Sequence, residues 1–318
     1  MQSCSVLPEL DDARRGDHAA FARAIEPYRR ELRAHCYRMA GSLHDADDLM
    51  QDSLLRAWRG IASFEGRASL RTWLYRVTTH ACLDKLERRA PRLLPIDMGP
   101  ASDPSAIGPP IEDAAFVEPC PTTLYERREA VALAFLVALQ LLTAKQRAAL
   151  ILRDVVGFEA SECAELLGQS VAAVNSALQR AREVLAARAA TPGPPPPHDP
   201  AVLARYLAAW EQSDASALVA LLRDDATLAM PPIQQWLRGA AAIRASLEAM
   251  VFTAGSRFAL LPLEANGVPG FAAYARDPAG VGHPMAIQLV DVAGDRIAAI
   301  TAFLAPGLFA SFGLPAHV

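Results

Sequence analysis

The sequence predicts a multidomain fold in which two all-α units precede a C-terminal α+β unit. At 318 residues, the chain is longer than a single hydrophobic core usually serves. Proline-rich stretches at 91–121 and 191–199 divide it into three parts. Apolar residues recur at helical spacing in the first two parts, whereas strand-like alternation dominates the third.

Composition restricts the class of protein. Hydrophobic residues make up 52% and charged residues 21% of the chain, which is typical of a soluble globular protein and excludes a fibre or a wholly disordered chain. The formal net charge is −4, yet residues 56–92 carry nine basic and three acidic side chains. This stretch is the most polarised basic part of the chain.

Cysteine usage and the apolar segments indicate a cytoplasmic protein. The five cysteines lie far apart without a CxxC pair, so we expect neither a disulfide framework nor a zinc site, and no cofactor. The longest apolar stretch, 130–142, is shorter than the roughly 20 residues that span a bilayer. The acidic start also lacks the positive segment of a signal peptide.

The proline-rich stretches set the expected domain boundaries. Residues 91–121 are rich in proline and acidic side chains, cannot bury enough apolar surface to fold alone, and are expected to form a linker. Residues 191–199 are expected to form a short, stiff polyproline spacer. The folded units are then 10–90, 122–190 and 200–318.

The first unit is predicted to be a helical bundle. Apolar residues recur at helical spacing over 21–39 and 49–58, and glycines stand at plausible helix ends. A further helix is expected to begin at Ser69, a good N-cap. It places Leu70, Trp73 and Leu74 on an apolar side, with basic side chains on the other side.

The second unit has helix-turn-helix spacing in its latter half. Gly168 marks the turn, and Ser170 opens the helix that follows. In that helix Val171, Val174 and Leu178 are expected to face the core. Any three-helix bundle would produce the same pattern, so periodicity alone does not distinguish DNA binding from simple packing.

The third unit changes from helices to strands. Amphipathic helices are expected near 202–210 and 218–222. Alternating segments at 258–267, 271–277 and 285–304 are typical of strands joined by Gly, Pro and Asp turns. Helices followed by antiparallel strands indicate an α+β domain.

Two separate motifs carry a family resemblance. Residues 45–59 and 64–89 resemble region 2 of bacterial sigma factors of the extracytoplasmic-function (ECF) group, and residues 142–183 resemble region 4. Residues 200–318 resemble the SnoaL-like domain, a conical α+β barrel that some of these factors, often labelled the SigG or SigJ type, carry. The resemblance implies a non-enzymatic subunit that binds core RNA polymerase, directs promoter-specific initiation and is regulated by its C-terminal domain.

The resemblance also implies where core polymerase binds. Region 2 of the family docks an acidic surface on the β′ clamp helices, and the β flap is the other expected contact. Carboxylates at the start of a helix suit the helix dipole. The alternative for this cluster is a solvated helix face. The implied polymerase-binding residues are Asp45, Asp48, Gln51 and Asp52.

Promoter opening is implied for the basic helix and the loop before it. In the family these elements hold an unstacked base of the minus-10 element, and melted DNA suits cations together with pockets for flipped bases. Trp73 is expected to pack, and His80 stands where asparagine is usual. The implied minus-10 residues are Phe64, Arg67, Arg71, Tyr75, Arg76 and His80.

Region 4 is implied to bind the minus-35 duplex with the helix that Ser170 opens. Asn175 and Ala177 stand where a lysine and an arginine are usual, which predicts weaker phosphate attraction. Arginines are the expected phosphate contacts, and amide side chains are the expected base contacts. The implied minus-35 residues are Ser170, Asn175, Ser176, Gln179, Arg180 and Arg182.

The third unit leaves alternatives open. A SnoaL-like cyclase or isomerase fused to a DNA-binding module would need a base such as Asp291, but no paired acid and base is evident. A sigma factor is favoured because such a fusion needs no region 2. The expected C-terminal pocket residues are Trp210, Trp236, Tyr274 and His283. A small ligand or an anti-sigma protein is the expected partner there.

The apolar run 303–314 has two interpretations. Its side chains exceed what one barrel strand normally hides, so the run is expected either to cover a neighbouring sigma surface or to close the mouth of its own barrel.

Overall fold

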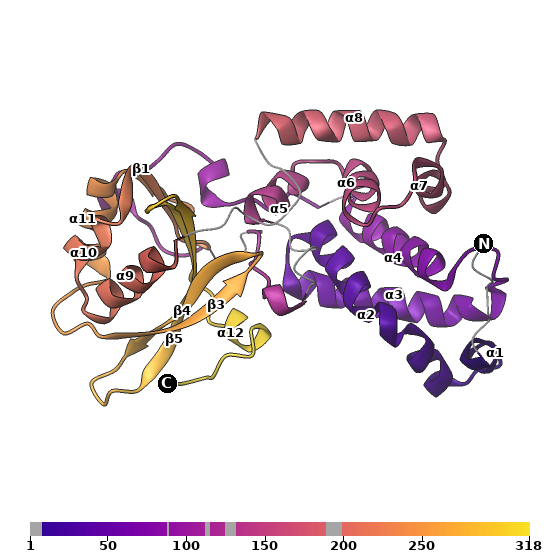
Figure 1. The fold of residues 1–318 in the computed structure, drawn as a ribbon, viewed down its shortest axis with the longest axis horizontal. Helices are drawn as coiled ribbons and strands as arrows, with labels where there is room; N and C mark the ends of the chain where they lie inside the picture. The colour runs from indigo at the N-terminus through magenta and orange to yellow at the C-terminus, as the bar shows by residue number, and fades with distance from the viewer. Residues whose placement is uncertain (1–7, 88, 112–114, 125–131, 189–198) are drawn as a thin grey trace. The chain divides into compact units, whose positions relative to one another are not determined.

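The computed structural model describes residues 8–87, 89–111, 115–124, 132–188 and 199–318 (Figure 1). The chain forms two compact units, of which the first holds residues 1–92 and 134–192 and the second holds residues 93–133 and 193–318. The boundary expected at residue 122 therefore falls inside a segment of the second unit. Apart from Asp199, the expected spacer 191–199 lies outside the described residues.

The first compact unit is helical. Its elements are α1 (Pro8–Arg14), α2 (His18–Ala40), α3 (Leu43–Gly60), η1 (Ile61–Ser63), α4 (Leu70–Leu86), α5 (Leu133–Gln140), α6 (Ala144–Leu150), the π-helical η6 (Ile151–Val155), α7 (Ala160–Leu167) and α8 (Val171–Ala187). Capping residues fix the ends of the helices that form the candidate site. Gly41 ends α2 at φ 73°, and the Ser69 hydroxyl accepts a hydrogen bond from the Thr72 amide at 3.0 Å.

A buried arginine joins the two helical parts of this unit. The guanidinium of Arg147 in α6 donates to the Met39 carbonyl at the end of α2, and to the carbonyls of Leu139, Gln140 and Leu142. Burial lowers the pKa of Arg147 to about 10. Helix C-termini concentrate unpaired carbonyls, so they solvate a buried cation without a carboxylate.

The second unit is a six-stranded sheet with helices. Its elements are α9 (Pro200–Glu211), α10 (Ala215–Val219), β1 (Leu222–Ala229), β2 (Trp236–Arg238), α11 (Ala240–Met250), β3 (Phe258–Ala265), β4 (Val268–Arg276), β5 (Gly282–Ala293), β6 (Arg296–Phe303) and α12 (Leu308–Ser311). The strand order is β2-β1-β6-β5-β4-β3, with β1 and β6 parallel and the other pairs antiparallel. Helices α9, α10 and α11 lie together beside the sheet (Figure 1).

The expected strands of this unit are confirmed, and two further strands were missed. The helix expected over 218–222 ends at Val219, because Leu222 already pairs with Ile297 in β6. Strand β1 carries Arg223, Asp224 and Asp225 near its start, so it lacks the apolar alternation that marks the other strands.

The C-terminal run packs on its own domain. Phe303, Leu308 and Phe309 are buried, and the Phe309 ring meets Tyr274 edge-on with centroids 5.1 Å apart. The Tyr274 hydroxyl donates to the Pro315 carbonyl at 2.8 Å. The run therefore closes its own domain, which is the second of the two interpretations expected from sequence.

The described part of segment 93–124 lies against the C-terminal sheet domain. Near its end, the Cys120 amide donates to Asn266 Oδ1 at 3.0 Å and the Asn266 amide donates to the Cys120 carbonyl at 2.9 Å. Near its start, the Trp236 indole donates to the Gly99 carbonyl at 2.9 Å, and the Ser102 amide donates to the Trp236 carbonyl at 2.8 Å. The segment does not fold alone, but it is bound at both ends to one domain.

Across the described residues, no helix combines the length and apolar character that crossing a membrane requires.

Candidate nucleic-acid and polymerase interface

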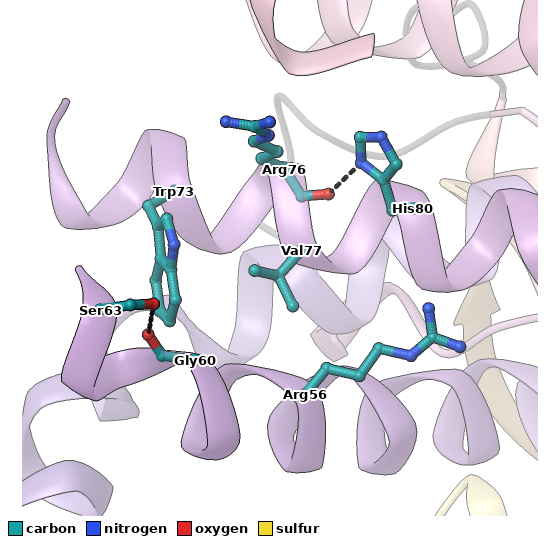
Figure 2. Close-up of a pocket in the computed structure, with 7 residues that line it drawn as sticks. All are labelled: Arg56, Gly60, Ser63, Trp73, Arg76, Val77 and His80. Atoms are coloured by element: carbon teal, nitrogen blue, oxygen red, sulfur yellow. Dashed lines mark hydrogen bonds between the residues drawn. The ribbon is translucent and has the colours of Figure 1, made fainter. Parts of the chain in front are cut away.

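A groove of about 320 Å³ runs between the end of α3 and the exposed side of α4. It is lined by Arg56, Gly60, Ser63, Trp73, Arg76, Val77 and His80. Figure 2 shows Trp73 and Val77 reaching from α4 toward α3. Gly60 makes room for the indole, because a Cβ atom there would lie 3.3 Å from Trp73 Cζ2.

Local hydrogen bonds set the polar edge of the groove. Ser63 Oγ donates to the Gly60 carbonyl at 2.8 Å and closes the turn after α3 (Figure 2). His80 Nδ1 donates a hydrogen bond to the Arg76 carbonyl at 2.9 Å. The other ring nitrogen, Nε2, is then left to bind a ligand.

Two arginines give the groove its positive charge. Arg56 is paired with Asp84 at 2.5 Å and with Asp52 at 3.0 Å, and the hydrogen bond to Asp84 raises its pKa. Arg76 is exposed and has no ion-pair partner among the described residues. Arg76 is therefore the cation of this groove that an anionic ligand meets without displacing a carboxylate.

Two aromatic residues expected at the minus-10 site are instead buried. Phe64 is 8% exposed and packs against Trp73 with centroids 5.1 Å apart. Tyr75 is 1% exposed, and its hydroxyl donates to Glu31 at 3.2 Å. Both rings are covered by protein in this structure, and their contact with bases stays a prediction.

Arg71 and Tyr75 share a face of α4 that the second helical part covers. The Arg71 guanidinium pairs with Glu31 at 2.8 Å and lies 5.0 Å and 5.2 Å from the ring centroids of Tyr75 and Phe158. Phe158 precedes α7, so this face is an internal contact within the first unit. Among the other expected residues, Arg67 is exposed and paired with Glu65, whereas Arg76 and His80 line the groove.

Asp45 has a structural position that the sequence did not predict. Its carboxylate is nearly buried and accepts hydrogen bonds from Arg89 and Arg92, both at 2.7 Å. Burial raises the pKa of Asp45, but the two hydrogen bonds outweigh burial and leave it lowered. Both arginines bond to Oδ2 of Asp45, and a contact between Asp45 and polymerase stays a prediction.

The remaining acidic residues of α3 do form an exposed face. Asp48 lies 3.4 Å from Lys85, Asp52 pairs with Arg56, and Gln51 is exposed. Leu55, one turn further along, is 55% exposed. Leu55 is not among the residues expected from sequence, although its spacing from Gln51 places both on one helix face.

Helix α8 presents the expected polar residues to solvent. Ser170 caps it by accepting from the Ala173 amide at 3.2 Å. The exposed residues on it include Asn175, Ser176, Gln179, Arg180 and Arg182. Val171, expected in the core, is 43% exposed at the first turn.

The two arginines of α8 differ in their partners. Arg182 pairs with Asp154 at 2.7 Å, and this hydrogen bond raises its pKa. Arg180 has no ion-pair partner within the described part of the chain. Gln179 donates to Glu183 at 3.1 Å, whereas the exposed Asn175 side chain lines a shallow groove with Leu178.

The expected pocket residues of the C-terminal domain do not lie together. Trp210 lines an internal cavity, but Trp236 bonds to Gly99, Tyr274 bonds to Pro315, and His283 is exposed beside Asp277 at 3.0 Å. Trp236, Tyr274 and His283 therefore lie outside the cavity, because each is bonded to another part of the domain. Among the described residues, no cluster of three or more His, Cys, Asp or Glu side chains could hold a metal ion.

Comparisons with known proteins match each part of the chain. Residues 24–92 match the Sigma-70 region 2 family, residues 132–185 match the Sigma-70 region 4 family, and residues 203–300 match the SnoaL-like domain. The crystal structure of the extracytoplasmic function sigma factor SigJ from Mycobacterium tuberculosis shares the fold, with a TM-score of 0.63 and 23% identity, over 93% of this chain and 99% of that one.

Curated relatives extend the likeness along the chain. The ECF RNA polymerase sigma factor SigG of Mycobacterium tuberculosis H37Rv is 44% identical over 96% of this chain and 86% of the relative. SigM of the same strain is 32% identical over 54% of this chain and 78% of the relative. With both helical sigma regions and the sheet domain in the same order, the chain belongs to the ECF RNA polymerase sigma factors.

Proposed function

We propose that this sigma factor holds an unstacked base of the melted minus-10 element in the groove between α3 and α4. As an ECF sigma factor, the chain binds core RNA polymerase and promoter DNA, directs promoter-specific transcription initiation, and is not an enzyme. The observation that carries the proposal is that one open groove contains an aromatic wall, Arg76 and His80, and that Arg76 has no ion-pair partner among the described residues.

The chemistry of the groove suits a single melted strand. Trp73 offers an aromatic face, and stacking of one base on such a face contributes about 1–3 kcal/mol. Arg76 supplies charge for a neighbouring phosphate, and His80 Nε2 supplies a hydrogen-bonding atom for a base edge. Phe64 takes part indirectly, because it packs against Trp73 and fixes the plane of the indole.

The exposed face of α3 is the proposed contact with core polymerase. Asp48, Gln51, Asp52 and Leu55 follow one another at helical spacing. Protein–protein interfaces often have a small apolar centre with a rim of polar and charged side chains that complement the partner. The exposed leucine and its polar and acidic neighbours have this arrangement. A basic helical partner would satisfy both features.

Helix α8 is the proposed minus-35 recognition helix. Asn175 can bond to the edge of adenine, and the exposed Val171 can contact a thymine methyl group. Arg180 is the proposed phosphate contact, since Arg182 would first have to leave Asp154. One free arginine implies a shallow salt dependence for this domain.

We propose that the C-terminal domain regulates initiation through segment 93–124. This segment connects the two sigma regions along the chain, and the C-terminal domain binds both of its ends through Trp236 and Asn266. A bound connector limits how far the two regions can move apart. Release of the segment therefore raises initiation. The protein acts in the cytoplasm, where core polymerase and promoter DNA meet it.

Run-off transcription with purified core polymerase tests the groove. The template is a promoter selected from genomic fragments by the wild-type holoenzyme. Trp73→Leu should lower initiation by about 5- to 150-fold while polymerase affinity stays unchanged, since about 1–3 kcal/mol of stacking is lost. The matched control is Trp58→Leu, which removes a tryptophan that stacks on His18 outside the groove. If both variants lower initiation equally, the proposal fails.

A further inference from the structure

The C-terminal domain encloses a cavity of about 210 Å³ between α9, α10 and α11 and the sheet. Its wall is apolar and includes Ala302, and its polar side chains are those of Tyr206, Trp210 and Gln288. An engineered cavity of roughly 150 Å³ is enough to hold benzene. This cavity therefore has room for a one-ring molecule with a short substituent.

The cavity has one polar corner. The Tyr206 hydroxyl donates to Gln288 Oε1 at 2.8 Å. Burial raises the pKa of the Tyr206 hydroxyl, and the neighbouring Trp210 side chain offsets part of that rise. Even so, Trp210 Nε1 has no hydrogen-bond partner among the described residues.

The unpartnered donor cannot easily turn to solvent. Trp210 is 4% exposed, and the edges of Phe252 and Phe258 hold its ring, with centroids 5.0 Å and 5.1 Å away. Buried polar groups in folded proteins nearly always have a partner, and leaving one unpaired is costly. An acceptor atom supplied by a ligand would remove that cost.

Charge excludes one class of ligand. Among the described residues that line the cavity, none carries a charge at neutral pH. An ionic ligand would lose its hydration there without gaining a counter-charge. We propose that the cavity is a binding site for a neutral, mostly apolar small molecule that presents one acceptor oxygen to Trp210 Nε1.

Two probes of nearly the same shape test this proposal on the full-length chain. Acetophenone has one ring and one carbonyl, and cumene replaces the carbonyl oxygen by a methyl group. The chain has four tryptophans, so ¹⁵N labelling of tryptophan gives few indole signals, and Trp210→Phe identifies the one that belongs to Trp210. Acetophenone should move that signal. Trp210→Phe should weaken acetophenone binding about three- to tenfold and cumene binding less than twofold.

Further variants separate the cavity from other sites. Trp236→Phe removes an indole that bonds to Gly99 and lines no part of the cavity, so it should bind both probes like the wild type. Ala302→Leu fills part of the cavity and should abolish binding of both. The proposal is overturned if neither probe moves the Trp210 signal. It is also overturned if Trp210→Phe weakens the binding of both probes equally. The acetophenone oxygen would then not accept a hydrogen bond from Trp210 Nε1, and a water or another group of the chain would do so instead.

Discussion

Asp45 lies at the start of α3 with its carboxylate held by Arg89 and Arg92. The two arginines follow α4, so the ion pairs fasten the end of one helix to the beginning of another. The Asp45 carboxylate thus has a structural role at the start of α3. Its neighbour Asp48, which is about half exposed, remains available for a partner.

Replacing Asp45 by asparagine should destabilise the chain by about 1–3 kcal/mol, because two guanidinium groups lose their charged acceptor. The carboxylate has a lowered pKa in the folded state. Its contribution is therefore complete above the unfolded pKa of about 3.9 and is lost as the pH falls through the lowered folded value.

Urea unfolding at pH 7 and at pH 3 measures this contribution. The difference between wild type and Asp45→Asn should be smaller at pH 3 than at pH 7. Asp48→Asn serves as the exposed control and should change stability little at either pH. An equal difference at both pH values would show that the carboxylate charge does not stabilise the fold.

Residue-level roles were only partly predictable from sequence. Helical spacing placed Trp73, Tyr75 and His80 on α4, but it could not say which of them a distant segment covers. Tyr75 is buried by Glu31, 44 residues away, and by Phe158. The Asp45 carboxylate pairs with Arg89 and Arg92, which lie 44 and 47 residues further along the chain. Such pairings depend on tertiary packing, which leaves no local pattern.

Helix α3 carries its proposed polymerase contact on one face, and Leu55 is the part that can be changed without disturbing the core. Because Leu55 is 55% exposed, Leu55→Ala should leave the unfolding midpoint nearly unchanged. It should weaken binding to core polymerase about three- to tenfold by removing apolar contact area. Binding is measured by fluorescence anisotropy of labelled protein.

A matched control tests whether the face itself matters. Val171→Ala removes another exposed apolar side chain, which lies on α8. It should leave affinity for core polymerase unchanged in the absence of DNA. Equal affinity of wild type and Leu55→Ala for core polymerase would contradict the proposal that this face of α3 binds polymerase.

Helix α8 separates sequence recognition from phosphate binding. Asn175→Ala should cost about 1–3 kcal/mol at one base pair of the minus-35 element and leave other positions unchanged. Arg180→Ala should weaken specific and scrambled elements alike and reduce the salt dependence by about one phosphate contact. Holoenzyme binding to both elements at several salt concentrations distinguishes the two effects. Identical losses for both variants would contradict this division.

Element positions were predicted where a cap or an alternating pattern marks them. Ser69, Gly168 and Ser170 mark helix ends, and the structure places helix ends there. Strand β1 escaped prediction because its charged start breaks the alternation, and only pairing with β6 makes it a strand. The binding of segment 93–124 was also missed, because its hydrogen bonds join backbone groups to loops more than 100 residues away.

At the scale of the whole molecule, Asn266 binds the segment that connects the two sigma regions along the chain. It is fully buried at φ 53°, and its side chain accepts from Cys120. Asn266→Gly keeps the left-handed backbone accessible but deletes that acceptor. Hydrogen exchange at the Cys120 amide should accelerate, and run-off initiation should increase several-fold.

A second deletion of a single hydrogen bond checks the same contact. Thr122→Val removes the hydroxyl that accepts from the Gly267 amide at 3.0 Å. It should change exchange and initiation in the same direction as Asn266→Gly. Faster exchange without any change in initiation would reject regulation through this segment.

The Arg71 and Tyr75 face of α4 is covered within the first unit, where Arg147 fastens α6 to the end of α2. The groove with Trp73 is open in the same unit. The proposed binding of a minus-10 base in that groove therefore requires no separation of the two helical parts.

Photocrosslinking tests the central claim most directly. Promoter DNA carries 5-iodouracil at one non-template position of the minus-10 element at a time, and the holoenzyme complex is irradiated and mapped by mass spectrometry. The account predicts that one position crosslinks to Trp73 and that Arg76→Gln weakens this crosslink while polymerase binding is intact. Crosslinks that avoid residues 56–80 at every position would contradict it.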